Sequence, residues 1–134
     1  HILTSRETNK LMNKTILVIE DDDFAVKAYK LKFEKEGFSV QVALDGNEAI
    51  AFFEKDPVDL VILDLMLPGI NGFDVLTAMR KNKRWGKTPV IVMSNLGQEQ
   101  DIKKCQDLGI SDYFIKSDIK ISEVVLKAKS LLTN

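Results

Sequence analysis

The chain has 134 residues, of which 45% are hydrophobic and 29% charged, and its formal net charge at pH 7 is -1. This length and balance are typical of one globular domain and exclude a disordered or collagen-like chain. No window holds the roughly 18 uncharged apolar residues of a membrane-spanning helix. The near-neutral charge offers no bulk attraction to nucleic acid or an anionic membrane. We therefore expect a soluble, cytoplasmic domain that binds neither nucleic acid nor a membrane directly.

The N-terminal segment, HILTSRETNKLMN, shows neither helical nor strand periodicity. We expect residues 1–13 to be a natural tail or the remnant of an expression tag, because a lone terminal histidine is more typical of a tag than of a ligand. Residues 14–134 are expected to form one folded domain.

From residue 14 onward, short apolar runs alternate with helical patterns. The runs are rich in Val and Ile and are bounded by turn residues, which predicts β-strands. These strands cover residues 15–19, 38–43, 60–63, 89–93 and 113–115. The first, third and fourth are apolar throughout, as in central parallel strands buried on both faces, whereas the second alternates as an edge strand does.

Between the strands, apolar residues recur at helical spacing. The predicted helices cover residues 24–36, 47–55, 73–82, 98–108 and 121–132. Gly37 and Gly109 follow two of them in the position where glycine commonly ends a helix. Five strand–helix pairs at this pitch predict right-handed crossovers and an α/β fold. We expect an open, doubly wound, five-stranded parallel sheet with five helices distributed over both faces.

Polar side chains stand where the predicted strands end, which is where open parallel sheets bind their ligands. They are Glu20, Asp21, Asp22 and Asp23 after the first strand, Asp64 after the third, Ser94 and Asn95 after the fourth, and Lys116 after the fifth. Carboxylates gathered without a partner would repel one another, and a hard cation such as Mg²⁺ resolves this. Asp64 is then placed to act as a nucleophile that forms an aspartyl phosphate, with Lys116 and Ser94 contacting the phosphoryl oxygens.

Four segments carry these residues: ILVIEDDDF, VILDLMLPGINGFDVL, PVIVMSN and GISDYFIKS. In this order and at these distances they resemble the signature segments of the response-regulator receiver family of two-component signalling. The resemblance covers residues 14–132 and implies a flavodoxin-like strand order of 2-1-3-4-5. It implies that a sensor histidine kinase or a phosphotransfer protein donates the phosphoryl group and that a downstream effector protein reads the result. The domain would not be an enzyme, but would assist its own phosphorylation and dephosphorylation.

The resemblance also implies a role for each residue of the acidic group. Asp64 matches the phosphoacceptor of the family. Glu20 and Asp21 match the acidic pair that binds Mg²⁺, with Asp21 as the direct ligand and Glu20 acting through water. The backbone carbonyl of Met66 matches the remaining protein ligand of the metal.

The remaining signature residues include two departures from the family pattern. Ser94 and Tyr113 match the switch residues of the family. Ordinary strand packing explains Tyr113 equally well. Lys116 matches the lysine that pairs with the phosphoryl group. The family usually has proline after this lysine, with a cis peptide before it, whereas this chain has Ser117. The family favours a small residue after the switch hydroxyl, whereas Asn95 is larger and is expected to restrict access to the acceptor.

Several other residues have ordinary structural interpretations. Of Asp22 and Asp23, one is expected to cap the first helix and the other to be solvated. The basic stretch 81–87, which carries Trp85, is interpreted as a solvated connection rather than a nucleic-acid contact. Cys105 lies at helical spacing with apolar residues and is expected in the core.

Two alternatives to a phosphorylated switch remain open. A flavodoxin-like cofactor binder would need a phosphate-cradling loop rich in Ser, Thr or Gly after the first strand, where residues 20–23 are all acidic. A degenerate receiver would be a scaffold that is never phosphorylated, and Asn95 and Ser117 motivate this second alternative.

Overall fold

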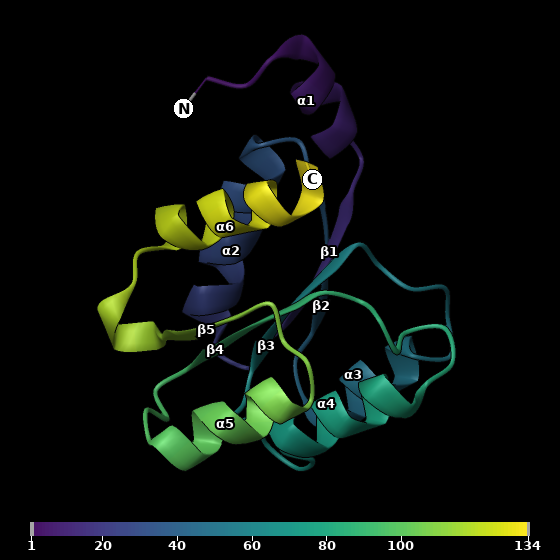
Figure 1. The fold of residues 1–134 in the computed structure, drawn as a ribbon, viewed down its shortest axis with the longest axis vertical. Coiled ribbons are helices and arrows are strands. Elements are labelled where there is room, and N and C mark those ends of the chain that lie inside the picture. Colours follow the sequence, from purple (N-terminus) through teal and green to yellow (C-terminus); the bar gives the residue numbers. More distant parts are fainter. Residues whose placement is uncertain (1, 134) are drawn as a thin grey trace.

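The computed structural model describes residues 2–133, and these residues form a parallel sheet of five strands with helices on both faces (Figure 1). The strands are β1 (Thr15–Ile19), β2 (Ser39–Ala43), β3 (Leu60–Asp64), β4 (Val90–Ser94) and β5 (Asp112–Ile115). Their order in the sheet is β2-β1-β3-β4-β5, and every neighbouring pair is parallel. The predicted fold class and strand order are therefore confirmed.

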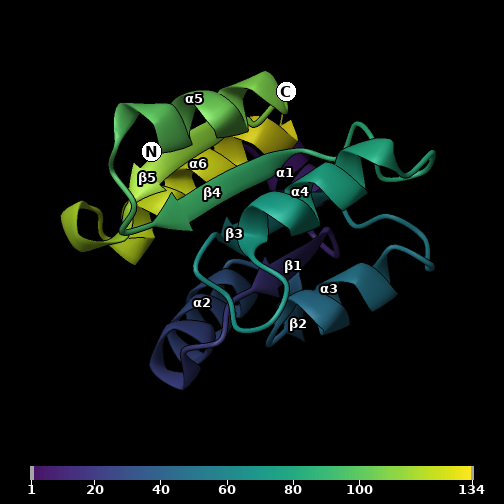
Figure 2. The same ribbon diagram turned by 90° about the horizontal axis from the view of Figure 1, so that it is seen from below.

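Six α-helices and one short 3₁₀ helix accompany the sheet within residues 2–133, one α-helix more than expected. They are α1 (Ser5–Leu11), α2 (Asp23–Lys35), α3 (Gly46–Phe52), α4 (Gly72–Lys81), α5 (Glu99–Asp107) and α6 (Ile121–Thr133), with η1 (Lys116–Asp118) after β5. Figures 1 and 2 show α2 and α6 on one face of the sheet and α3, α4 and α5 on the other. Among these residues, no helix has both the length and the apolar character required to cross a bilayer.

Each face of the sheet carries its own apolar core. The central strands alternate their side chains between the two, so that Leu17 packs with α3, α4 and α5 while Ile16 packs with α1, α2 and α6. β3 and β4 are buried along their whole length, and β2 alternates as an edge strand, as predicted. Cys105 is fully buried as expected, and this burial raises the pKa of its thiol to about 11.

The sequence pattern predicts no helix in the N-terminal segment, but residues Ser5–Leu11 form α1. A capping box starts the helix: Thr4 Oγ1 accepts the N–H of Glu7, and the Glu7 carboxylate accepts the N–H of Thr4, both at 3.1 Å. Leu11 is buried beside α6, and Lys10 Nζ donates to the carbonyl of Thr133 at 3.2 Å. Because Leu11 is the one buried residue of this helix, the sequence has no apolar repeat from which the helix could be predicted. His1 lies outside the described residues.

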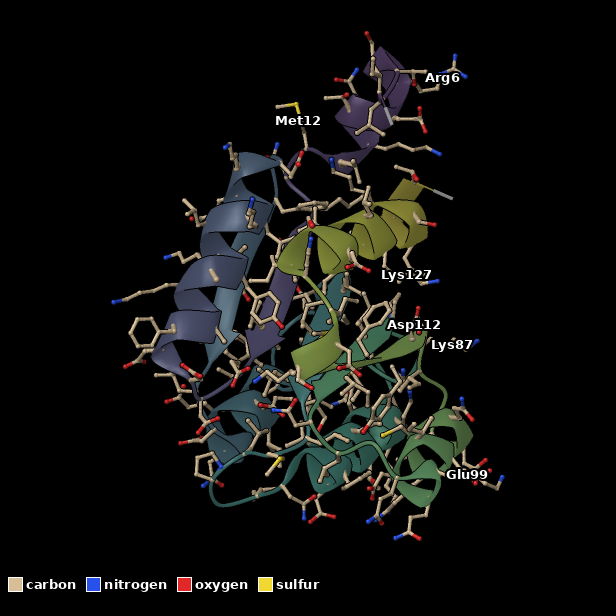
Figure 3. All side chains as sticks on the ribbon, turned by 90° about the vertical axis from the view of Figure 1, so that its left-hand side faces the viewer. Arg6, Met12, Lys87, Glu99, Asp112 and Lys127 are labelled. Carbon is tan, nitrogen blue, oxygen red and sulfur yellow. The ribbon has the colours of Figure 1, made fainter. Side chains whose placement is uncertain are left out.

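Replacing Leu11 with alanine should lower the free energy of unfolding by about 2–4 kcal/mol, because the side chain is fully buried between α1 and the domain. Met12→Ala is the matched control, since the Met12 side chain is 54% exposed (Figure 3) and its truncation should change stability by less than about 0.5 kcal/mol. Urea denaturation followed by circular dichroism measures both. Equal stability of the two variants would show that α1 does not pack on the domain.

The loop between α4 and β4 also differs from its sequence-based interpretation. Trp85 is fully buried, its Nε1 donates to the carbonyl of Lys55 at 2.9 Å, and its ring centroid lies 5.0 Å from that of Phe53. The prediction of a solvated connection is therefore wrong for Trp85. It holds for the neighbouring Arg84, which is exposed and pairs with Asp56 at 3.2 Å. The charged residues of the stretch 81–87 predicted solvent exposure, whereas the tertiary fold places the Trp85 indole in the core.

Arg80, in the last turn of α4, is a structural residue that the sequence analysis did not single out. Its guanidinium donates to the carbonyls of Leu108 at 2.8 Å, Gly109 at 2.7 Å and Thr88 at 2.9 Å. These bonds tie α4 to the end of α5 and to the segment before β4. Burial lowers the pKa of Arg80 from its usual value.

Candidate functional site

The predicted site residues converge at the carboxyl-terminal edge of the sheet. β1, β3, β4 and β5 are neighbours in that order, so the residues that end them emerge side by side. Asp64 and Ser94 are the last residues of β3 and β4, and Lys116 begins η1 directly after β5. Glu20 and Asp21 follow β1. Parallel topology thus brings together residues that lie as much as 96 positions apart in the chain.

Three carboxylates gather at this edge. Glu20, Asp21 and Asp64 each bring an oxygen within 4.8 Å of the others. Glu20 and Asp64 are buried, whereas Asp21 is exposed. Oxygen donors of like charge held this close are a ligand set that suits a hard cation such as Mg²⁺. Met66, whose side chain is exposed, adjoins this cluster through its backbone N–H, which donates to Asp64 Oδ1 at 3.0 Å.

Lys116 links two of these carboxylates. Its Nζ donates to Asp64 Oδ2 at 2.9 Å and also to Glu20 Oε1. Burial lowers the pKa of the Lys116 ammonium, but the hydrogen bonds to the two carboxylates outweigh it and the net pKa is raised. The pKa of Glu20 is also raised, because burial of its carboxylate outweighs the bond from Lys116. The ammonium therefore stays charged beside the Asp64 oxygen.

The side chains of both predicted switch residues form hydrogen bonds with the backbone of Leu96. Ser94 is buried, and its Oγ accepts the N–H of Leu96 at 3.1 Å. The Tyr113 hydroxyl donates to the carbonyl of the same residue at 2.5 Å, and burial raises the pKa of this phenol. Both bonds go to the loop between β4 and α5 rather than to the acidic cluster, so this loop is held in place from two sides.

The departures from the family pattern lie next to each other. Residues 2–133 contain no cis peptide, so the bond between Lys116 and Ser117 is trans. The side chain of Asn95 is exposed, and its Oδ1 accepts the N–H of Ser117 at 3.0 Å. The sequence analysis treated these two positions separately and missed their contact. The signal that could have revealed it is the backbone N–H that serine has and proline lacks.

The ordinary interpretation of Asp22 and Asp23 is confirmed at both positions. Asp22 is the N-cap of α2, and its Oδ1 accepts the N–H of Phe24 at 2.9 Å. A carboxylate at this end of a helix also interacts favourably with the helix dipole. Asp23, which follows it, is exposed in the first turn.

The fold and the site together define a flavodoxin-like α/β protein with an acidic, lysine-bridged cluster at the carboxyl ends of its strands. Residues 16–128 match the family model of the response regulator receiver domain. The chain therefore belongs to the receiver domains of response regulators, the proteins of two-component signalling systems.

Curated relatives agree with this assignment. The chain is 36% identical over 121 residues to regulatory protein VanRc of Enterococcus gallinarum, a match that covers 90% of this chain and 51% of that protein. It is 33% identical over 121 residues to transcriptional regulatory protein SrrA of Staphylococcus aureus, covering 90% and 48%. The chain thus spans about half the length of these relatives. RpaA of Synechocystis, 35% identical over 117 residues and covering 87% and 48%, is named a DNA-binding dual master transcriptional regulator. The expectation of no nucleic-acid partner gains no support from these relatives.

Solved structures show the same fold. The receiver domain of the Francisella response regulator 1452 superimposes with a TM-score of 0.81 at 31% identity, covering 90% of this chain and 97% of that one. A two-component response regulator from Clostridium difficile gives a TM-score of 0.82 at 25% identity, covering 90% and 96%. The matched residues in both cases make up most of the sheet and its helices.

Proposed function

We propose that this receiver domain is a phosphorylation-dependent switch in which Asp64 accepts the phosphoryl group. The observation that carries the proposal is the ion pair between Asp64 Oδ2 and Lys116 Nζ at 2.9 Å, beside the carboxylates of Glu20 and Asp21. A lone strand-end aspartate would be ordinary. An aspartate that is buried, paired with an ammonium and surrounded by oxygen donors at the edge where α/β sheets bind ligands is suited to phosphoryl transfer.

The transfer is a substitution at phosphorus. A carboxylate oxygen of Asp64 attacks, the new O–P bond forms, and the P–N bond of a phosphohistidine breaks, with its electron pair returning to the imidazole nitrogen. The donor is a sensor histidine kinase or a phosphotransfer protein. The Lys116 ammonium neutralises charge that develops on the phosphoryl oxygens, and the Ser94 hydroxyl, at the end of the strand that pairs with the Asp64 strand, would donate to one of them. The acceptor belongs to the domain itself, so no separate substrate is turned over.

The acidic cluster is suited to hold Mg²⁺ during this reaction. Glu20, Asp21 and Asp64 would supply carboxylate oxygens, with Asp21 as the direct ligand of the acidic pair and Glu20 acting through water, and Met66 would supply its backbone carbonyl. When bound, the ion neutralises negative charge on the phosphoryl oxygens. What supports the metal is the donor set of three carboxylates within 4.8 Å, two of them buried.

Phosphorylation would change the surface formed by α5, β5 and α6. A phosphoryl group adds about −1.5 to −2 charge and new acceptor oxygens. The Ser94 hydroxyl, which accepts from Leu96 in the unmodified chain, turns to donate to a phosphoryl oxygen, and the loop leading into α5 follows. Tyr113 holds the carbonyl of the same loop residue and moves with it. On this surface Asp112 of β5 and Lys127 of α6 pair at 3.5 Å (Figure 3), and a downstream effector protein would bind here.

Incubation with acetyl phosphate and Mg²⁺ tests the proposal. We expect the mass of the chain to increase by one phosphoryl group, and the increase to disappear when a chelator removes the metal. No increase under either condition would favour a scaffold that is never phosphorylated. A yellow chromophore on purification would instead favour a flavin-binding protein of the same fold.

A further inference from the structure

A hydrogen bond joins the two loops that carry the proposed phosphoryl contacts. Asn95 follows Ser94 at the end of β4, and Ser117 follows Lys116 at the end of β5. Ser94 lies opposite Ile115 in the parallel pair, so both loops leave the sheet side by side. Asn95 Oδ1 accepts the Ser117 N–H at 3.0 Å. This bond is a direct link between the residue after the Ser94 hydroxyl and the residue after the Lys116 ammonium.

We propose that Asn95 is a positioning residue, which holds Lys116 against Asp64 and Glu20 through the backbone of Ser117. This inference rests on the proposed phosphorylation of Asp64. From its size alone, the Asn95 side chain would be expected to obstruct access to Asp64. The inference gives it a positioning role instead. The Asn95 carboxamide is directed to Ser117 instead, where it accepts a backbone N–H.

The backbone at Lys116 depends on such an outside contact. Lys116–Asp118 is a single three-residue turn of 3₁₀ helix, a geometry with weak internal hydrogen bonds. Its N-cap, Ile115, provides no side-chain hydrogen bond to the first turn. Asn95 supplies an acceptor for one N–H of that turn. Lys116 has a flexible four-carbon side chain, so a fixed backbone reduces the conformational freedom that its ammonium loses on pairing.

Asn95 is itself held on both sides. The preceding residue, Ser94, is buried at the end of β4, and the following residue, Leu96, is bound by Ser94 Oγ and by the Tyr113 hydroxyl. The Asn95 carboxamide therefore projects from a fixed backbone. A displacement of the β4–α5 loop would therefore move the Asn95 carboxamide and, through its hydrogen bond to Ser117, the backbone of η1. A change at Ser94 on phosphorylation would reach Lys116 by this route as well as through the phosphoryl group itself.

Three variants of the 134-residue chain separate this role from simple bulk. Asn95→Ala removes both the acceptor and the volume, Asn95→Leu removes the acceptor but keeps a similar volume, and Ser117→Ala keeps the N–H as the matched control. We expect Asn95→Ala and Asn95→Leu to weaken the Mg²⁺-dependent affinity for beryllofluoride, a phosphoryl mimic, by about 2- to 10-fold, the range for loss of one hydrogen bond. Ser117→Ala should bind as the parent chain does.

Two further measurements distinguish positioning from general damage. In ¹⁵N–¹H spectra without ligand, the Ser117 amide proton should move upfield in both Asn95 variants, because it loses its acceptor. Urea denaturation midpoints should stay close to the parent value, since both partners are exposed.

The outcomes are separable. Parent-like affinity in Asn95→Leu together with altered affinity in Asn95→Ala would show that only size matters and would overturn the inference. An unmoved Ser117 amide in both Asn95 variants would overturn it as well. Failure of the parent chain to bind beryllofluoride would refute the proposed function instead, and the amide shift would still test the link between the loops.

Discussion

Replacing Asp64 with asparagine is expected to abolish phosphorylation by acetyl phosphate and Mg²⁺. The amide has no anionic oxygen to attack phosphorus, and the cluster loses one of its three carboxylates. The carbonyl of asparagine can still accept the Met66 N–H, and Glu20 still pairs with Lys116, so the variant should fold. Intact-mass spectrometry after incubation with the phosphodonor measures the effect directly, and circular dichroism verifies the fold.

Asp23→Asn is the matched control for this experiment. Asp23 belongs to the same acidic run but is exposed in the first turn of α2, outside the cluster of three carboxylates. Its phosphorylation should equal that of the parent chain. Undiminished mass gain in Asp64→Asn would show that another residue takes the phosphoryl group. Loss of labelling in Asp23→Asn but not in Asp64→Asn would place the phosphorylation site at Asp23.

Replacing Trp85 with alanine should lower the free energy of unfolding by about 3–5 kcal/mol, the range for truncation of a large buried aromatic. The indole is fully buried, donates to the Lys55 carbonyl at 2.9 Å and packs on Phe53. The total stability of such a domain is about 5–15 kcal/mol, so this variant would be close to unfolding. Urea denaturation followed by far-ultraviolet circular dichroism is the right measurement, because Trp85 is the only tryptophan in the chain.

Two companions show which part of the side chain matters. Trp85→Phe keeps an aromatic ring in the core but removes the indole N–H, so it should cost less than the alanine variant. Arg84→Ala alters the exposed neighbour on the same loop, and its ion pair with Asp56 is worth at most about 1 kcal/mol. Equal stability of Trp85→Ala and Arg84→Ala would mean that the loop is solvated, as the charge of the stretch suggests.

The strands and the polar residues at their ends were predictable from short-range patterns, whereas the order of the strands was implied by the family resemblance. Apolar runs such as 15–19 and 60–63 match strands to within one residue. Parallel topology then places the residues after each strand at one edge, whatever the connections between them. Glu20, Asp64 and Lys116 therefore came together as expected. The helices that pack on the sheet were likewise predicted from apolar residues at helical spacing, although α3 ends three residues before its predicted limit.

Hydropathy patterns were enough to predict which strands are central and which functional groups stand at their ends. Three contacts are visible only in the folded chain: Leu11 packs beside α6, Trp85 packs near Phe53, and Asn95 accepts from Ser117. The difference lies in the range of the interactions. Periodicity reports on neighbours within a turn or a strand, whereas these contacts join segments separated by 22 or more positions and exist only after both have been placed by the core.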